Sequence, residues 1–175
     1  MKKIAVIYKS KYGFTQKYAA WIAKALGADL WEWAAIKPAQ ISAYDVVVYG
    51  GGLYASGIAG IKKIKKNLPA KLVVFTVGLA CPADTDYSEI LNKNFTPAQL
   101  KAIKVFHLHG GIDYKNLSPI HKIMMAMVKK SVEKKPLAER SKEDKAMLET
   151  YGAKLDFTER SAIKPLIDHV RSLSE

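Results

Sequence analysis

The sequence predicts an α/β protein in which a five-stranded parallel sheet is covered by helices on both faces. Segments with strand and helix patterns alternate along the chain, as in doubly wound folds. The strand at 45–50 is a nearly unbroken apolar run, which is typical of a parallel strand buried on both faces. With this spacing, the five strands fit the order 2-1-3-4-5. Right-handed crossovers would then place the ends of strands one, three and four on one edge of the sheet.

Each element has its own local signal. The strands are expected near residues 3–8, 28–33, 45–50, 71–77 and 104–109. The first helix is expected near 15–26, with Thr15 as its N-cap, because apolar residues recur there at helical spacing. Further helices are expected at 57–68, from Pro97 after the N-cap Thr96, and from near Thr158 to the end. Pro165 should kink the last helix or delay its start.

A long segment between the fifth strand and the last helix exceeds what this fold requires. It runs from about 112 to 157 and contains a predicted helix at 119–131 and a second helical piece near 142–151. The chain shows no internal repeat and no flexible linker. We therefore expect a single domain over residues 1–175 that carries a helical insertion after strand five.

Composition excludes several classes of function. The net charge is +12, but lysine supplies nearly all of the positive charge, whereas nucleic-acid readers favour arginine. We therefore expect no nucleic-acid partner. Cys81 is the only cysteine, which excludes an internal disulfide and a Cys-x-x-Cys redox pair. The first residues lead directly into a strand, and no apolar run is long enough to span a membrane. These features indicate the cytoplasm, with attachment to a membrane surface as an alternative.

The most informative segment is the turn between the first strand and the first helix. Ser10 and Thr15 supply hydroxyl groups, and Gly13 lets the backbone approach a ligand closely. A turn of this kind aims backbone N–H groups and the positive end of a helix at whatever lies above the sheet. It contains neither a Gly-x-Gly-x-x-Gly fingerprint nor a Walker loop. The turn therefore predicts a phosphate site, with an ordinary strand–helix turn as the alternative.

This stretch resembles the flavodoxin signature, and the resemblance implies a flavodoxin-like fold with noncovalently bound FMN. It implies that residues 10–15 wrap the FMN phosphate and that two further loops, after strands three and four, frame the flavin ring. No catalytic acid or base and no metal ligand are expected. The residues expected to bind the cofactor are Ser10, Lys11, Tyr12, Gly13, Phe14, Thr15, Gly52, Leu53, Tyr54, Ala55, Val77, Gly78 and Leu79.

The cysteine, two histidines and three acidic residues outside this site are expected to have structural roles. Cys81 is expected to be a small buried apolar residue, since no motif around it supports a nucleophile. His107 and His109 lie on the same face of strand five, and a pair packed by helices or held by hydrogen bonds is favoured over a metal site. The acidic residues Asp84, Asp86 and Glu89 are expected to form a solvated polar turn.

Residues 111–135 are similar to the corresponding part of flavodoxin-like protoporphyrinogen dehydrogenases that use menaquinone. The chain departs from those enzymes after strand three, where residues 54–57 replace an Arg-Tyr-Gly-His-like run; this bears on porphyrin activity and not on FMN binding. The helix at 119–131 carries an apolar stripe with lysines off it. It could dock a hydrophobic substrate, a quinone or an anionic membrane, or simply pack on the sheet.

The expected function is redox. The chain would be an electron-transfer protein or a small FMN-dependent dehydrogenase, and its partner would be a redox protein, a hydrophobic substrate or a quinone. One alternative is a menaquinone-dependent protoporphyrinogen IX dehydrogenase proper. The other is a binding module that kept the fold without redox chemistry.

Overall fold

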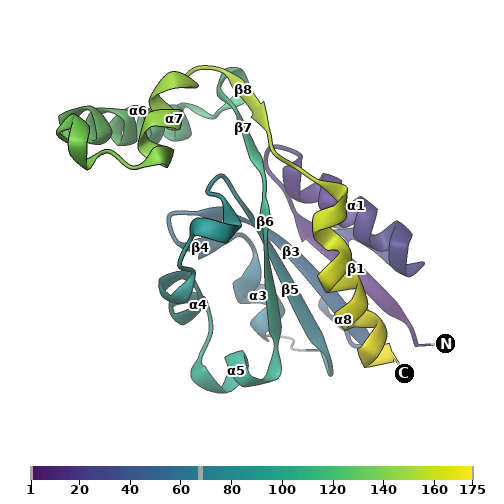
Figure 1. Cartoon of the computed structure of the whole chain (residues 1–175). Coiled ribbons are helices and arrows are strands. Elements are labelled where there is room, and N and C mark those ends of the chain that lie inside the picture. Colours follow the sequence, from purple (N-terminus) through teal and green to yellow (C-terminus); the bar gives the residue numbers. More distant parts are fainter. Residues whose placement is uncertain (1, 67–68, 175) are drawn as a thin grey trace. The chain divides into compact units, whose positions relative to one another are not determined.

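The computed structural model describes residues 2–66 and 69–174 (Figure 1). The chain divides into two compact units. The first unit comprises Met1–Gly110 and Thr158–Glu175, and the inserted unit comprises Gly111–Phe157. The bounds of the inserted unit coincide closely with the insertion predicted at 112–157.

The first unit is built on a parallel sheet. Its strands are β1 (Ile4–Lys9), β2 (Asp29–Glu32), β3 (Val46–Tyr54), β5 (Leu72–Gly78) and β6 (Lys104–His109). They lie in the order β2-β1-β3-β5-β6, which is the predicted order 2-1-3-4-5, and every neighbouring pair is parallel. The short strand β4 (Gly57–Ile58) pairs antiparallel with β3. The predicted fold class is confirmed.

Helices cover both faces of this sheet, because successive residues of each buried strand point to opposite sides. Val6 and Val48 belong to the core on one face, and Ile7 and Tyr49 belong to the core on the other. The first core packs under α1 (Phe14–Leu26) and α8 (Lys164–Ser174). The second packs under α2 (Pro38–Ile41), α3 (Ile61–Lys66), α4 (Ser88–Asn94) and α5 (Pro97–Ala102).

Several predicted bounds need correction. The helix predicted at 57–68 begins at Ile61, because residues 57–58 form β4 instead, and residue 68 lies outside the described residues. Glu89 lies in α4 rather than in a polar turn; Asp84 ends the 3-10 helix η1 (Pro82–Asp84). The 3-10 helix η4 (Arg160–Ile163) precedes α8, so Pro165 stands at the start of the last helix and delays it, as expected.

The inserted unit has a two-stranded antiparallel sheet and two helices. Its elements are β7 (Gly111–Asp113), η2 (Tyr114–Asn116), α6 (Pro119–Lys134), η3 (Leu137–Glu139), α7 (Lys142–Glu149) and β8 (Lys154–Asp156). The rings of Tyr114 and Tyr151 lie 4.8 Å apart, and Lys135 Nζ donates to Asp144 Oδ2 over 2.8 Å. Among the described residues, no helix combines the length and the apolar character needed to cross a bilayer.

Candidate functional site

The turn after β1 has the shape expected of a phosphate site. Gly13 precedes α1 with a φ of 91°, in the left-handed region that side chains disfavour. Its N–H donates to Ser10 Oγ over 3.1 Å, which folds the turn back on itself. Thr15 is not the N-cap that the sequence predicted; it is the second residue of the helix, and its side chain is almost wholly buried.

This helix end suits an anion. The first N–H groups of an α-helix lack partners within the helix, and Gly13 has no side chain with which to cap them. The first turn of α1 carries no acidic residue, and the neighbouring Lys9 and Lys11 are exposed. Partial positive charge at the helix end and two lysines therefore act in the same direction, and the donors present fit a phosphate group.

The glycines predicted to form a loop after strand three belong to the strand. Gly50 and Gly51 pair with β1 on one side and with β5 on the other. A Cβ on Gly50 would collide with the ring of Phe75, and one on Gly51 would lie 2.7 Å from Ile58 Cγ2. The group that approaches these two glycines is therefore protein, and the loop begins later than expected.

That loop is a tight hairpin turn between β3 and β4. Ala55 has a φ of 46° and Ser56 a φ of 62°, and positive φ at both central residues is typical of a type I′ turn. This conformation is unfavourable for side chains other than glycine, so the turn needs support from elsewhere.

Asn94, at the end of α4, supplies that support, and sequence reasoning did not identify it. Its side chain is buried, and its Oδ1 accepts from the N–H of Ile58 over 3.1 Å. Its Nδ2 donates to the carbonyl oxygens of Ser56 and Ile90, each over 2.8 Å. Lys93 Nζ adds a bond to the carbonyl oxygen of Ala55 over 3.1 Å. Nothing in the local sequence around residue 94 indicates contact with a turn 38 residues away.

Two tyrosines connect the hairpin to the phosphate turn. The rings of Tyr12 and Tyr54 pack edge to face, with their centroids 6.5 Å apart. The Tyr54 ring also lies over Gly52, where a Cβ would be 2.9 Å from Cε2. Burial is the main reason that the pKa of Tyr54 rises to about 12, so the phenol stays neutral at ordinary pH. Tyr54 therefore offers an aromatic surface at this edge of the sheet.

The third predicted segment reaches the same edge. Val77 and Gly78 are the last residues of β5, and Leu79 follows on the surface. Leu53 of the hairpin lies against Gly78, where a Cβ would be 3.1 Å from Leu53 Cδ1. The Val77 side chain belongs to the buried core on the α1 and α8 face of the sheet. The structure thus brings the segments after β1, β3 and β5 together.

The histidines of β6 are held by different partners. His107 Nδ1 and Thr76 Oγ1 are 2.6 Å apart, and the His107 ring stacks on Tyr87 with a centroid distance of 3.5 Å. Burial lowers the pKa of His107 to about 4, so it is neutral at ordinary pH. His109 Nε2 lies 3.0 Å from the carbonyl oxygen of Leu79. The hydrogen-bonded interpretation thus fits each histidine singly, not as a pair bonded to each other.

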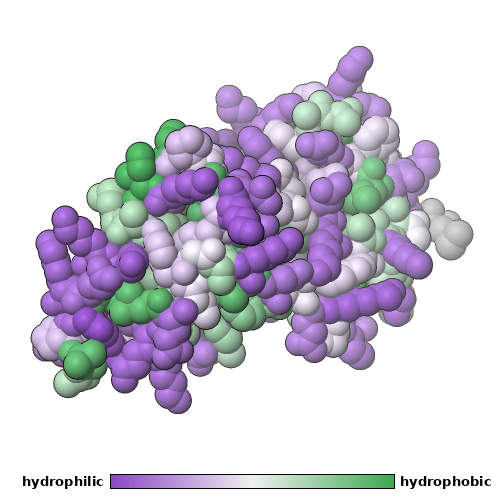
Figure 2. Space-filling view, turned by 90° about the horizontal axis from the view of Figure 1, so that it is seen from above, coloured by the Kyte–Doolittle hydropathy of each residue, from purple (hydrophilic) through white to green (hydrophobic). Residues whose placement is uncertain are grey.

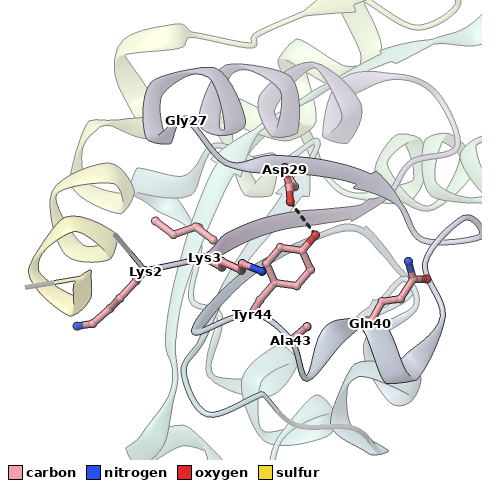
Figure 3. A pocket seen from close by; sticks show the side chains of 8 residues that line it. Lys2, Lys3, Gly27, Asp29, Gln40, Ala43 and Tyr44 are labelled. Atoms are coloured by element: carbon pink, nitrogen blue, oxygen red, sulfur yellow. Dashed lines mark hydrogen bonds between the residues drawn. The ribbon is translucent and has the colours of Figure 1, made fainter.

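No metal site is found in the part of the chain that the structure describes. Cys81 is half-buried at the start of η1, more exposed than predicted. An open hollow of about 450 Å³ lies beside the beginnings of β1 and β2, at the opposite edge of the sheet from the phosphate turn (Figure 3). Lys2, Lys3 and Tyr44 line it, and the Tyr44 hydroxyl donates to Asp29 Oδ2 over 2.8 Å. It contains none of the predicted site residues.

Solved structures with a similar arrangement include several flavoproteins. A flavodoxin, WrbA-like protein from Agrobacterium tumefaciens shares 16% identity over 98% of this chain and 99% of its own, with a TM-score of 0.47. Flavodoxin 2 from Bacillus cereus shares 17% identity over 61% of this chain and 84% of its own, with a TM-score of 0.45. A flavoprotein from Lactobacillus acidophilus, solved with FMN, shares 14% identity over 62% and 93%, with a TM-score of 0.42. No curated protein matches the chain.

A family model gives the stronger relationship. The model described as a flavodoxin domain matches residues 5–138, which is most of the chain and includes all of the predicted site residues. This match agrees with the strand order and with the anion-binding shape of the turn at 10–15. The chain therefore belongs to the flavodoxin family, and this membership confirms FMN as the cofactor predicted from the sequence.

Proposed function

We propose that this protein is an FMN-dependent redox protein, acting in electron transfer or as a small dehydrogenase. One observation carries the proposal. An uncapped helix end at Gly13, the hairpin at 54–57 and the end of β5 meet at one edge of the sheet. That edge lies at the carboxyl ends of parallel strands, where open α/β sheets bind their ligands.

Different residues would bind the phosphate and the ring of FMN. Residues 10–15 would hold the phosphate through backbone N–H groups and the hydroxyls of Ser10 and Thr15. Leu53 and Tyr54, with the backbone of residues 77–79, would contact the ring and exclude water from part of it. FMN supplies the redox chemistry when bound, because its ring accepts and returns electrons. We assign no protein acid or base, because the flavin itself carries the redox chemistry.

Reconstitution tests the proposal. The purified chain is mixed with FMN, free cofactor is removed, and the visible spectrum is recorded before and after anaerobic reduction with dithionite and reoxidation in air. We expect FMN to be retained and its spectrum to bleach and recover. Retained FMN that cannot be reduced would instead support a binding module without redox chemistry. Loss of all FMN on desalting would contradict the cofactor site itself.

A second candidate is the oxidation of protoporphyrinogen IX with a quinone as acceptor. The inserted unit favours it: a methionine-bearing basic helix follows the stretch at 111–114, as in the enzymes that this part of the sequence resembles. Each cycle would remove two electrons and two protons from the porphyrinogen and leave a quinone as a quinol. Porphyrin fluorescence with a soluble menaquinone analogue, under anaerobic conditions, measures this reaction. Bleaching of FMN by dithionite but not by the porphyrinogen would restrict the protein to other donors.

A further inference from the structure

Helix α6 of the inserted unit leaves a row of large apolar side chains on the surface. Ile120, Ile123 and Met127 are 69%, 61% and 67% exposed, and Met124 and Val128 are also exposed. Their positions recur every three or four residues, so they form one continuous stripe along the helix. Large apolar side chains gathered in this way on a surface mark an interaction site more often than scattered ones do.

Within the inserted unit, α6 packs through a different side of the helix from the stripe. His121, Met125 and Val132 are more buried and lie on another side of the helix. Lys129 Nζ lies 4.8 Å from the ring centroid of Tyr151, beyond α7, and 3.7 Å from Glu133 Oε1. Within the inserted unit, α6 therefore packs through a different row of the helix from the stripe.

Positive charge borders the stripe. Lys130 and Lys134 continue the row that Ile123 and Met127 begin, because residues three or four apart share a face. Lys122 is exposed one row further round. The helix as a whole carries four lysines against one acid, Glu133. The space-filling view shows hydrophobic patches interspersed with hydrophilic side chains on the face that it presents (Figure 2).

We propose that the α6 stripe docks on the surface of an anionic lipid bilayer. The helix would lie in the interface, with Ile120, Ile123 and Met127 entering the acyl region and Lys130 and Lys134 reaching the headgroups. This proposal is independent of the FMN site, since all of its residues belong to α6.

The side chains of α6 favour lipid over a second copy of the chain or another protein as the occupant. A second copy of the chain would bring two lysine-bordered stripes together, and like charges would oppose that contact. Protein interfaces draw most of their affinity from Trp, Tyr and Arg, and α6 contains none of these. An acyl phase needs only apolar side chains, and anionic headgroups need only nearby lysines.

Cosedimentation of the full chain with lipid vesicles tests the proposal. Vesicles of phosphatidylglycerol mixed with phosphatidylcholine are compared with pure phosphatidylcholine, at about 20 mM and about 0.5 M salt, where screening differs strongly. We expect binding to the anionic vesicles at low salt, and much weaker binding to neutral vesicles or at high salt. No binding to anionic vesicles at low salt would overturn the proposal.

Two variants and one control locate the surface. Reversing Lys122, Lys130 and Lys134 to Glu should weaken binding at least about 100-fold, since each lysine near an anionic surface contributes about fivefold. Ile123→Ser with Met127→Ser should weaken it roughly tenfold or more, because apolar surface no longer leaves water. The control is Lys101→Glu with Lys104→Glu, two exposed lysines of the first unit.

The control variant should bind nearly as wild type does. An equal loss in it would contradict the assignment to α6 and indicate a response to overall charge. Size-exclusion chromatography with light scattering gives the remaining check. A dimer that the Ile123→Ser and Met127→Ser changes dissociate, without any vesicle binding, would identify a second copy as the occupant and overturn the proposal. Visible absorbance of bound FMN in every variant shows that the first unit has folded.

Discussion

Helices α1 and α6 carry the same kind of apolar periodicity and use it in opposite ways. In α1, Tyr18, Ala19 and Ile22 are completely buried against the sheet. In α6, Ile123 and Met127 follow equivalent spacing and stay in contact with water. Spacing alone therefore predicts that a helix has an apolar face, but it does not predict what covers that face.

The two units also differ in how many apolar residues they bury. The first unit buries apolar residues on both faces of its sheet, in two separate cores. The inserted unit buries far fewer, among them Ile112, Leu117 and Val132, and its polar contacts, such as that of Lys135 with Asp144, lie near the surface. Since buried apolar area is the main source of stability, we expect the first unit to be the more stable of the two.

The largest predicted difference is between matched substitutions in the two helices. Ile22→Ala should cost about 2–5 kcal/mol of unfolding free energy, because it opens a cavity in a closed core. Ile123→Ala should cost less than about 0.5 kcal/mol, since the side chain is already in water. Urea unfolding followed by circular dichroism measures both. Similar losses in the two variants would show that the α6 stripe is buried in solution, which would remove the contrast.

A second prediction compares a buried polar side chain with a surface one. Asn94→Ala should cost about 2–4 kcal/mol, because it leaves the N–H of Ile58 and the carbonyl of Ser56 without their partner inside the protein. FMN affinity should fall with it, since the hairpin carries Leu53 and Tyr54. Asp113→Ala is the counterpart in the inserted unit, where the carboxylate bonds Asn116 near the surface. Urea midpoints should move much less for Asp113→Ala than for Asn94→Ala; equal shifts would contradict this ranking.

The third prediction concerns the pH range in which a residue of each unit stops contributing to stability. The pKa of His107 is about 4 in the folded protein, below its usual value of about 6.5, so the unfolded chain binds the extra proton first. The contribution of His107 to the free energy of unfolding is therefore fully present above about pH 6.5 and is lost as the pH falls toward 4. Partial exposure of the ring reduces the loss to roughly 1–2 kcal/mol.

In the inserted unit, the hydrogen bond from Lys135 lowers the pKa of Asp144. The contribution of Asp144 to stability is therefore lost only as the pH falls below the ordinary carboxyl range. Urea unfolding of wild type and His107→Asn between pH 7 and pH 4.5 measures the histidine's share. The variant should lose the part of the pH dependence that lies in this window. An unchanged slope would show that His107 does not titrate as the structure implies.

Much of the fold could be predicted because its signals are local. Apolar runs predict the strands, and the expected N-cap Thr96 forms a capping box with Gln99, in which each side chain accepts the other's backbone N–H. Consecutive glycines at the end of a strand favour a loop in which another group approaches the backbone closely, so the sequence predicts a loop from Gly50. Pairing with strands on both sides overrides that preference here, and the neighbouring Phe75 and Ile58 require glycine.

The features that could not be predicted depend on contacts between distant segments. Asn94 reaches the hairpin only because α4 packs beside β4, and the pairing of His107 with Thr76 follows from the register of two strands. The sequence predicts Thr15 as the N-cap because it does not reveal that Gly13 adopts a left-handed conformation before the helix. The phosphate turn itself was visible because all of its residues lie within six positions of one another.

The most direct test of the central claim compares FMN with riboflavin, which lacks the phosphate. Titration of the protein by flavin fluorescence gives the dissociation constant of each ligand for wild type, Ser10→Ala and Thr15→Val. Loss of a hydrogen bond to a charged group costs about 1.5–3 kcal/mol. We therefore expect each variant to bind FMN roughly tenfold to a hundredfold more weakly, while riboflavin affinity stays nearly unchanged. Equal losses for the two ligands would show that the turn at residues 10–15 does not hold the phosphate.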